Sequence, residues 1–381
     1  MSGTSVDGID AALINIDHGK SKLNCIATYS TPFAAPIRDK ILAACTSRPS
    51  HANQVFELDQ QLAQCYADAV LQLLQGTKQT YADIAAIGNH GQTINHAPGA
   101  TPPFSLQVGN AHRLADLTKI PVVSDFRSAD LAAGGQGAPL TPAFHDYIFH
   151  NREENRVVAN LGGIANISIL PKESNTAVIG FDTGPANGLM DCWVEQHHDT
   201  RYDHNGEWAA SGKIDQDLLL TMLADAYFQL APPKSTGREM FNSTWLRNIL
   251  NSPGGHRKHN KIKSQDVQAT LCELTAITLA NAIKRYASNS TRLILCGGGT
   301  HNTTLVRQLQ QHLPSLTIDS SDKFGIDPSY VEAIAFAWLA DRHLNKLCGN
   351  LPSATGATKE VVLGRLTHPS KPESIIRGAL N

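Results

Sequence analysis

A strand, a glycine turn and a second strand occur twice in this chain, about half a molecule apart. The clearer copy runs from residue 157 to 170, where Gly162 and Gly163 separate two apolar runs. The opening of the chain has the same design, because a turn from Gly3 to Gly8 precedes an apolar run at 11–17. The likeness is one of architecture and not of residue identity. It predicts two halves of similar build.

Apolar runs and helical spacing alternate along the rest of the chain. We expect one long helix at 266–286, capped by Ser264 or Asp266, and we read residues 201–262 as irregular and polar. The remaining elements that we expect are strands at 22–33, 84–87, 120–123, 292–296 and 316–319, with helices inside 37–76, at 142–150 and from 328 to 344. Strands that alternate with helices in both halves predict an α/β fold with mixed sheets.

The most polar run of the chain, residues 151–155, is the candidate domain boundary. A length of 381 residues fits two domains. We expect an N-terminal domain at 1–152 and a C-terminal domain at 153–381, with the tail from residue 350 packing back on the first domain.

Composition excludes several classes of protein. Lys and Arg number 32 against 34 Asp and Glu, a formal net charge of −2 that argues against a nucleic-acid or acidic-membrane partner. The seven cysteines are scattered without a C-x-x-C pair, which is typical of reduced thiols and not of a zinc site. No run approaches 18 apolar residues and the start lacks a signal-peptide pattern, so we expect a soluble, cytoplasmic protein.

Asp182 is the first candidate for a reacting group. It lies in the glycine-rich stretch 180–188, between an apolar run at 176–179 and a helical pattern at 189–194. We expect this carboxylate at the end of a strand, facing the edge of the sheet where ligands bind in open α/β folds. The alternative is a turn-forming Asp that accepts backbone N–H groups near the helix start, unless Asn187 caps that helix instead.

Three glycine turns follow strands or open the chain: Gly3 to Gly8, Gly162 with Gly163, and Gly297 to Gly299. Together they fit two phosphate loops and a nucleotide platform, although no P-loop and no G-x-G-x-x-G turn is present. The hydroxyls of Thr4 and Ser5 and the carboxylate of Asp7 suit phosphate and Mg²⁺ contacts, with no fixed protein metal site. The alternative for the first turn is a frayed terminus before a hairpin. A turn of this kind is also expected to follow a strand.

Four further charged residues each allow two interpretations. Glu332 lies in the first turn of its helix, where a carboxylate favours the helix dipole without any catalytic role. Arg127 ends a strand together with Asp125, as an ion pair or as a ligand clamp. Lys234 and Arg238 either meet phosphate or lie on a solvated loop. The 16 histidines show no ligand spacing and indicate structural or solvated roles.

Taken together, eight motifs resemble those of the anhydro-N-acetylmuramic acid kinase family, over residues 1 to about 365. The motifs are the segments 2–10, 88–93, 125–127, 134–140, 160–166, 180–187, 234–239 and 296–299.

The resemblance implies two ribonuclease-H-like domains, with mixed sheets flanked by helices and an ATP cleft between them. It implies a kinase that converts ATP, water and 1,6-anhydro-N-acetylmuramic acid into ADP and N-acetylmuramic acid 6-phosphate, in peptidoglycan recycling. The implied partner is this small anhydro amino sugar, the cofactors are ATP and Mg²⁺, and we expect a homodimer with no nucleic acid or membrane partner. Two alternatives are an ordinary amino-sugar kinase, in which Asp182 deprotonates a hydroxyl, and a non-catalytic ATP-switched binding module.

Where the motifs match, the resemblance implies the following roles for residues of this chain. Asp182 becomes the catalytic base, with Glu332 holding the water or the sugar. Arg127 is expected to meet the lactyl carboxylate, and Thr93 to bind the sugar. The nucleotide-binding residues are Gly3, Thr4, Ser5, Val6, Asp7, Gly8, Ile9 and Asp10, joined by Gly162, Gly163, Gly297, Gly298 and Gly299, with Mg²⁺ near Asp7.

Overall fold

The computed structural model describes the chain except for residues 4, 21, 46–51, 238–239, 252–261 and 371–381. It divides into two compact units. The first unit comprises residues 1–132, 333–349 and 361–381, and the second comprises 133–332 and 350–360. None of the helices in the described part of the chain is both long and apolar enough to cross a membrane.

The break between the units differs from the boundary expected at residue 152. The helix α5 (Thr141–Phe149) belongs to the second unit because it packs on that unit's sheet. Its His145 Nδ1 lies 2.8 Å from Ser168 Oγ, and a Cβ on Gly180 would lie 2.4 Å from Pro142 Cγ. Polarity at 151–155 therefore marks a loop inside the second unit.

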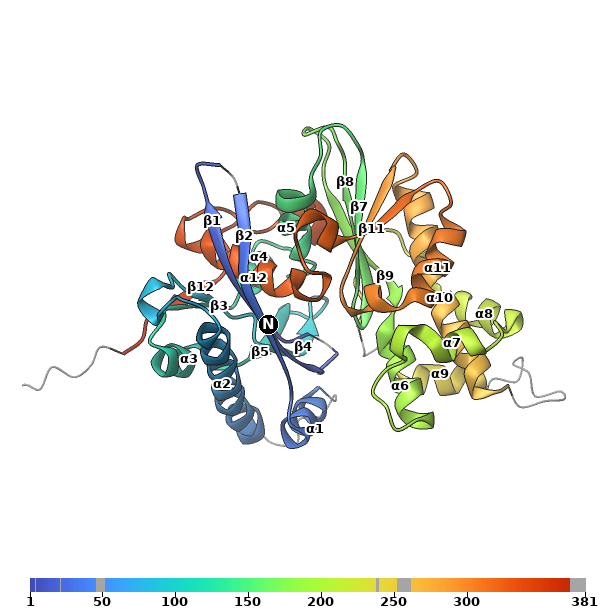
Figure 1. Ribbon diagram of the computed structural model, residues 1–381, viewed down its shortest axis with the longest axis horizontal. Helices are drawn as coiled ribbons and strands as arrows, with labels where there is room; N and C mark the ends of the chain where they lie inside the picture. The colour runs from blue at the N-terminus through green and yellow to red at the C-terminus, as the bar shows by residue number, and fades with distance from the viewer. Residues whose placement is uncertain (4, 21, 46–51, 238–239, 252–261, 371–381) are drawn as a thin grey trace, which may run out of the picture. The chain divides into compact units, whose positions relative to one another are not determined.

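The second unit is built on one five-stranded sheet with the order β11-β10-β7-β8-β9 (Figure 1). Its strands are β7 (Arg156–Leu161), β8 (Ile164–Leu170), β9 (Ile179–Pro185), β10 (Arg292–Cys296) and β11 (Thr317–Ser320). The strands β7, β8 and β9 form an antiparallel meander, whereas β10 and β11 run parallel to β7. This arrangement of parallel and antiparallel strands with helices confirms the expected α/β fold with a mixed sheet.

Helix α10 (Ser264–Tyr286) packs on one face of this sheet, next to α11 (Thr303–His312). Alternate residues of β7 point to α10, so Val157, Ala159 and Leu161 are fully buried in a shared core. Neither Ser264 nor Asp266 caps α10, because the N-cap position is Lys263 and no side chain caps it. Other described helices of this unit include α6 (Asn187–His197), α13 (Pro352–Thr355) and short 3-10 turns at 298–301, 321–324 and 328–330.

Residues 201–262 were expected to be irregular, and this was wrong for most of the described part. They contain α7 (Glu207–Ser211), α8 (Gln216–Leu223) and α9 (Ser243–Leu250), with 3-10 turns at 204–206 and 226–229. Two of these helices have side-chain caps, since Asp215 accepts from Leu218 N and Asn242 accepts from Trp245 N. The helices have five to eight residues, too short for periodicity to reveal them.

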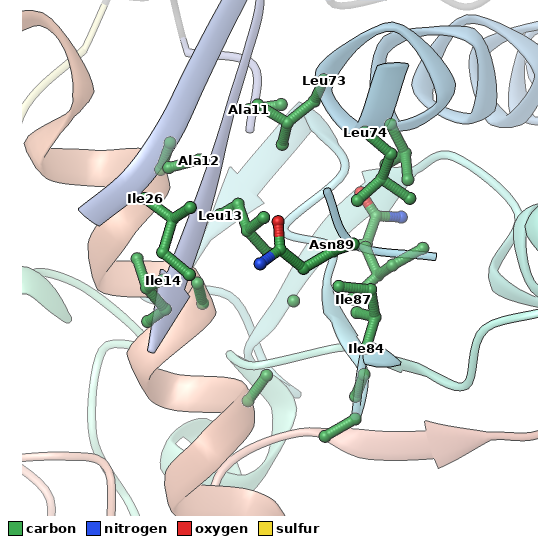
Figure 2. A pocket seen from close by; sticks show the side chains of 18 of the residues that line it. Ala11, Ala12, Leu13, Ile14, Ile26, Leu73, Leu74, Ile84, Ile87 and Asn89 are labelled. Atoms are coloured by element: carbon green, nitrogen blue, oxygen red, sulfur yellow. The ribbon is translucent and has the colours of Figure 1, made fainter. Parts of the chain in front are cut away.

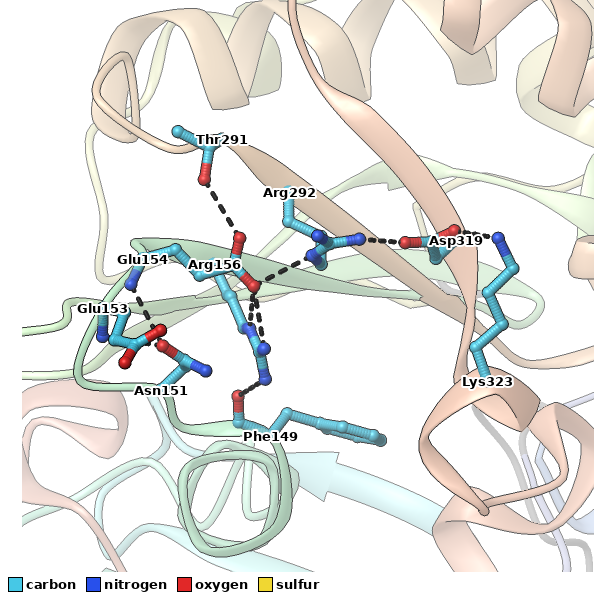
Figure 3. A network of polar contacts seen from close by, with 9 residues as sticks. All are labelled: Phe149, Asn151, Glu153, Glu154, Arg156, Thr291, Arg292, Asp319 and Lys323. Carbon is cyan, nitrogen blue, oxygen red and sulfur yellow. Dashed lines mark hydrogen bonds and ion pairs between the residues drawn. The ribbon is translucent and has the colours of Figure 1, made fainter.

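A network of charges joins the amino ends of β7 and β10 to Asp319 of β11 (Figure 3). Glu154 Oε1 lies 2.7 Å from Arg156 Nη2 and 2.9 Å from Arg292 Nε. Arg292 also pairs with Asp319, which in turn pairs with Lys323. Burial opposes ionisation of Glu154, yet the two guanidiniums hold its pKa below the usual value. The network therefore keeps two arginines side by side at the start of adjacent parallel strands.

The strands of the first unit form three separate sets. One hairpin joins β1 (Gly8–Asp17) to β2 (Lys22–Pro32), and another joins β4 (Gln92–Ala97) to β5 (Phe104–Val108). The third set has the order β12-β6-β3, made of β3 (Ile87–Gly88), β6 (Val122–Ser124) and β12 (Arg365–Thr367). The described helices are α1 (Ala35–Ala44), α2 (Ala52–Gln75), α3 (Ala111–Thr118), α4 (Ser128–Ala132), most of α12 (Val331–Leu344) and a 3-10 turn at 81–83. The β4–β5 hairpin was not expected from the sequence.

Candidate functional site

Asp182 lies within strand β9 and not beyond the carboxyl end of a strand, so that expectation was wrong. The Gly-Pro pair that suggested a turn continues the strand instead, because Gly184 adopts φ +148° next to a β-bulge on β9, in which Thr183 is the extra residue. Helix α6 (Asn187–His197) then follows, which confirms a helix at the expected residues 189–194 and extends it at both ends. Asn187 does not cap α6; its Nδ2 donates to Leu161 O at 2.8 Å.

Three polar residues form a row across the sheet of the second unit. Asn160 of β7 pairs with Asn166 of β8, and Asn166 pairs with Asp182 of β9. Directly opposite residues on antiparallel strands share a face, so the row is roughly 10 Å long between the outer Cα atoms. Glu332 extends the row at the other end, because Asn160 Nδ2 donates to Glu332 Oε1 at 2.9 Å. The two predicted catalytic carboxylates therefore belong to one polar row.

A loop that includes Tyr227 and Lys234 holds Asp182 along the outer edge of β9. Asp182 N donates to Lys234 O at 3.1 Å, and Tyr227 Oη donates to Asp182 O at 2.7 Å. Thr236 N donates to Asp182 Oδ2 at 2.9 Å, which orients the carboxylate. The backbone N–H that this Asp accepts lies 54 residues away in sequence, so the local turn interpretation was wrong.

Lys234 is a half-buried cation beside this carboxylate. Its Nζ lies 4.5 Å from the centre of the Tyr227 ring and donates to Tyr227 O at 3.2 Å. Burial, followed by repulsion from Arg285, lowers the Lys234 pKa, and attraction by Asp182 opposes that shift. The remaining loop residues Arg238 and Glu239 lie outside the described part of the chain.

The two glycine turns of the second unit meet at the carboxyl ends of the parallel strands β7 and β10. Gly297 has φ +81°, and a Cβ there would lie 2.4 Å from Asn160 Oδ1. A Cβ on Gly299 would lie 2.7 Å from Leu161 Cβ, and the nearest atom to one on Gly298 is Asn187 Nδ2 at 4.0 Å. The backbone is thus packed at Gly297 and Gly299 but open at Gly298, where a ligand could approach closely.

The turn at the start of the chain is anchored on both sides within the first unit. Ser2 Oγ and Tyr66 Oη lie 2.7 Å apart, and Gln92 Nε2 donates to Gly3 O at 3.2 Å. Val6 adopts φ +57°, an uncommon conformation for a β-branched residue. The turn is therefore packed in place, and the alternative of a frayed terminus was wrong for the described residues. Thr4 lies outside the described residues.

The donor set of this turn suits a nucleotide-bound Mg²⁺ better than a protein-held one. Asp7 is exposed, while burial raises the pKa of the neighbouring Asp10 carboxyl. No group of three or more His, Cys, Asp or Glu side chains in the described residues could hold a metal ion. Mg²⁺ needs few carboxylates when phosphates and waters supply its other ligands.

Arg127 is fixed by a histidine that the sequence analysis left among the structural ones. Its Nε and Nη2 lie 3.1 Å and 2.9 Å from His90 Nε2. Burial, and next the Arg127 charge, hold the His90 pKa well below its usual value. The neutral ring therefore accepts from Arg127 at Nε2 and donates from Nδ1 to Gly91 O, at 2.7 Å. Asp125, the partner expected for Arg127, accepts from Ser128 Oγ at 2.5 Å.

Thr93 lies on β4 within a second polar set of the first unit. Gln107 Nε2 donates to Thr93 Oγ1 at 3.1 Å and to Ser105 Oγ at 2.8 Å. His96 Nδ1 lies 2.9 Å from Ser105 Oγ. Burial and then the nearby Arg127 charge lower the His96 pKa to about 4, so its ring is neutral at pH 7. The Arg127 guanidinium thus lies near two imidazole rings that are both neutral at pH 7.

The residues that orient the predicted catalytic and binding side chains were not predicted from the sequence. Asn160 orients Glu332, Thr236 orients Asp182 and His90 orients Arg127. Asn160 and His90 each stand next to a glycine-containing turn after a strand, which was the available signal. Thr236 acts through its backbone N–H, so its side chain gave no signal.

Comparison with known proteins gives one consistent result. The sequence model of the anhydro-N-acetylmuramic acid kinase family matches residues 1–369. The anhydro-N-acetylmuramic acid kinase of Saccharophagus degradans is 46% identical over 372 residues, covering 97% of this chain and 98% of that protein. The protein of the same name from Coxiella burnetii (strain RSA 493) is 43% identical over 366 residues, covering 96% and 95%.

A solved structure, the activator of the 2-hydroxyisocaproyl-CoA dehydratase from Clostridium difficile with bound ADPNP, covers 88% of this chain and 98% of its own. Its TM-score is 0.42 at 13% identity, too low to support an inference. The family match spans nearly the whole chain, and both relatives exceed 40% identity over almost their full lengths. The chain belongs to the anhydro-N-acetylmuramic acid kinase family.

Proposed function

We propose that this chain uses ATP and water to convert 1,6-anhydro-N-acetylmuramic acid into N-acetylmuramic acid 6-phosphate, a step of peptidoglycan recycling. The observation that carries the proposal is the polar row of the second unit, in which Asn160 and Asn166 connect Glu332 to Asp182. A carboxylate that is half-buried and oriented by a backbone N–H is suited to act as a general base.

The chemistry of the substrate explains why a base is needed. The anhydro bridge ties O6 to C1, so O6 carries no proton until the ring opens. In the proposed step Asp182 takes a proton from a water whose oxygen attacks C1. The C1–O6 bond breaks, O6 takes the γ-phosphoryl group, and ADP is released. Glu332, held by Asn160, is placed to position the water or the sugar.

The glycine turns would hold the nucleotide. Gly3 to Asp10 supply backbone N–H groups for the phosphates in the first unit, and Gly162, Gly163 and Gly297 to Gly299 do so in the second. The open backbone at Gly298 supports this assignment. Mg²⁺ bound with ATP near Asp7 would neutralise charge on the transferred phosphoryl group.

Arg127 and Thr93 are the proposed sugar contacts of the first unit. The guanidinium of Arg127 matches the lactyl carboxylate in charge and in fork geometry. The neutral His90 that holds it adds no competing charge. The homodimer and the cytoplasmic location stay predictions from the resemblance.

Turnover in ¹⁸O-labelled water tests the reaction. We expect label at C1 of the product and none in its phosphate group. Because a reducing sugar exchanges its C1 oxygen with water, unlabelled product kept in the same water for the same time is the control. Label confined to phosphate would mean simple ATP hydrolysis and would refute the proposal.

A further inference from the structure

A second cavity, of about 270 Å³, lies in the second unit on the α10 side of strand β9. Successive residues of a strand point to opposite faces, so Phe181 lines this cavity whereas Asp182 belongs to the polar row on the other face. The end of α8, the 3-10 turn at 226–229 and residues 278–286 of α10 supply other walls, together with Lys234. We call this cavity the α10 pocket. It is separate from the site proposed for the reaction.

Aromatic rings form the apolar wall of the α10 pocket. Phe181 is fully buried, and Tyr286 packs edge-on against it with the ring centres 5.2 Å apart. Phe228 stacks on Phe241 at 5.6 Å, and a Cβ on Gly184 would lie 2.7 Å from Phe228 Cε1. Rings fixed in this way favour a flat aromatic partner. Because the volume is below the roughly 300–1,000 Å³ of pockets for drug-sized ligands, that partner is small.

Two cations and no carboxylate line the α10 pocket. Lys234 is half-buried, and the exposed Arg285 has its guanidinium carbon 5.2 Å from the centre of the Tyr286 ring. Neither cation forms an ion pair with a carboxylate in the described part of the chain. Their mutual repulsion contributes to the lowered pKa of Lys234, after burial. An anion bound at both cations would offset this repulsion.

The hydroxyl groups of the α10 pocket differ in whether they already have a partner. Thr183 Oγ1 donates to Ala165 O at 3.2 Å. Thr278 Oγ1 donates to Leu274 O at 2.8 Å. Tyr286 Oη, in contrast, is buried and has no hydrogen-bond partner among the described residues. A buried hydroxyl without a partner costs free energy, and an acceptor on a bound ligand would recover it.

The loop at the α10 pocket also holds the backbone of Asp182. Lys234 lines the pocket, and its carbonyl oxygen accepts from Asp182 N at 3.1 Å. Tyr227, the neighbour of the lining residue Phe228, donates from Oη to Asp182 O at 2.7 Å. Lys234 Nζ in turn donates to Tyr227 O at 3.2 Å. A ligand that orders the Lys234 side chain therefore also orders both backbone contacts of Asp182.

We propose that the α10 pocket binds a small aromatic anion, with its ring against Phe228 and Tyr286 and its anionic group at Lys234 and Arg285. The bound anion restricts the motion of residues 227–236 and so fixes Asp182 from the opposite face of the sheet. A carboxylate and a phosphate monoester share the required charge, and the test below separates them. The proposal rests on the geometry of the pocket and not on the proposed reaction.

Two simpler occupants explain the α10 pocket less well. An uncharged apolar molecule would cover the half-buried Lys234 without giving its charge a partner, which costs free energy. A small inorganic anion would neutralise the cations but would leave the aromatic wall in contact with water. Only a ligand with both a ring and a negative charge satisfies both parts of the pocket.

Titration calorimetry of the full chain tests the ligand class. The probes are phenylacetate and phenyl phosphate, with phenylacetamide as the uncharged control and acetate as the control without a ring. We expect one-to-one, saturable binding of an aromatic anion, at least about tenfold tighter than that of either control. The tighter of the two probes identifies the anionic group. Equal affinity for phenylacetate and phenylacetamide, or no binding of either probe, would overturn the proposal.

Two variants locate the bound probe in the α10 pocket. Arg285→Gln should weaken binding by about tenfold, whereas Lys284→Gln, at the preceding exposed position of α10, should not, because Lys284 does not line the pocket. Ala282→Leu should abolish binding by filling the pocket, and its thermal midpoint shows whether it folds. Parent-like affinity in Arg285→Gln, or in a folded Ala282→Leu, would overturn the assignment.

Amide exchange tests the connection to Asp182. A saturating probe should slow exchange several-fold at Asp182 N, which donates to Lys234 O, and at Thr236 N, which donates to Asp182 Oδ2. Unchanged exchange at both amides would overturn the connection. None of these readouts uses enzymatic activity, so a failed kinase assay would count against the proposed function alone.

Discussion

The five strands of the second unit form one sheet, whereas those of the first unit fall into three sets, and residues of β1 and β3 line a cavity of about 730 Å³ (Figure 2). Both units contain a glycine turn that leads into an antiparallel hairpin. In the second unit the turn is held by a central strand, β7, which is bonded on both edges. In the first unit it is held by side chains, such as Tyr66 on Ser2 and Gln92 on Gly3. The same local pattern is thus supported by a continuous backbone ladder in one unit, and in the other by side chains together with a single pair of backbone bonds between Met1 and Asp10.

This difference extends to the predicted catalytic and binding groups. Asp182 sits on a strand of the continuous sheet, and its carboxylate accepts from a backbone N–H. Arg127 is oriented by a side chain, His90, whose ring lies 4.5 Å from that of Phe336. Backbone ladders tolerate substitution of side chains, while side-chain contacts do not. We therefore expect the second unit to be the more rigid frame and the first the more easily disturbed.

The largest expected effect follows from changing the proposed base in the rigid frame. Asp182→Asn keeps the size of the side chain and an oxygen for the Thr236 N–H but removes the proton acceptor. Because general-base catalysis contributes about 10²–10⁴-fold, kcat should fall by that factor with the fold intact. The measurement is ADP release with the anhydro sugar, next to Asp217→Asn, an exposed control in the same unit. A rate within a few-fold of the parent would remove Asp182 from the mechanism.

The second prediction tests whether the charged residues at the amino ends of β7 and β10 stabilise the five-stranded sheet of the second unit. Glu154→Gln leaves Arg156 and Arg292 adjacent without the carboxylate between them (Figure 3). Removing one partner of a buried pair costs about 3–5 kcal/mol, and partial exposure of these groups reduces our expectation to about 2 kcal/mol. Urea unfolding measures the loss, with the exposed neighbour Glu153→Gln as the matched control. Equal stability of the two variants would contradict this role.

Much of the second unit could be predicted from the sequence because its elements are long or strongly patterned. Apolar periodicity in the sequence predicted the strand–turn–strand at 157–170 and the helix near 266–286. The sequence did not predict the helices α8 and α9, because a helix of eight residues has barely two turns and shows little periodicity. Gly184 and Pro185 suggested a turn where the chain continues as a strand, since a β-bulge at Thr183 of β9 accommodates them.

The candidate site was predictable in its reacting groups but not in what positions them. Asp182 and Glu332 stand out as carboxylates beside glycine turns and helix starts. Their partners depend on tertiary contacts, because Thr236 is 54 residues from Asp182 and Asn160 is 172 residues from Glu332. No local pattern encodes such pairs.

A smaller effect is expected for changes at Arg127, the proposed sugar-binding residue, because a side chain orients it. Arg127→Lys loses the two-pronged contact with His90, so KM for the anhydro sugar should rise about tenfold with a smaller change in kcat. His90→Leu should have a similar effect, because it removes the acceptor for Arg127. His90→Gln, which retains an acceptor, should recover part of the loss. Arg113→Lys, a change at an arginine of α3 in the same unit, is the control, and equal KM values for all four variants would contradict the assignment.

The smallest expected effect is a difference between the two units in how much stability each loses in mild acid. Neutral histidines lie in both: the buried His90 and the half-buried His96 in the first unit and the buried His145 in the second. Burial lowers the pKa of His145 to about 3, and burial followed by the Arg127 charge lowers that of His96 to about 4. Because the folded pKa values lie below the usual 6.5, the unfolded chain binds protons first as pH falls. Stability is therefore complete above pH 6.5 and is lost progressively below it.

Between pH 7 and 6 this loss is less than about 1 kcal/mol for each histidine. With two such histidines against one, the first unit should lose more amide protection than the second over this range, after correction for intrinsic exchange rates. His96→Gln should reduce the pH dependence in the first unit only, and His145→Gln in the second only. The carboxylates Glu154 and Asp319, whose pKa values are lowered, keep their stabilisation here and lose it only in stronger acid. If the second unit loses more amide protection than the first near pH 6, the continuous backbone ladder does not make the second unit the more rigid one.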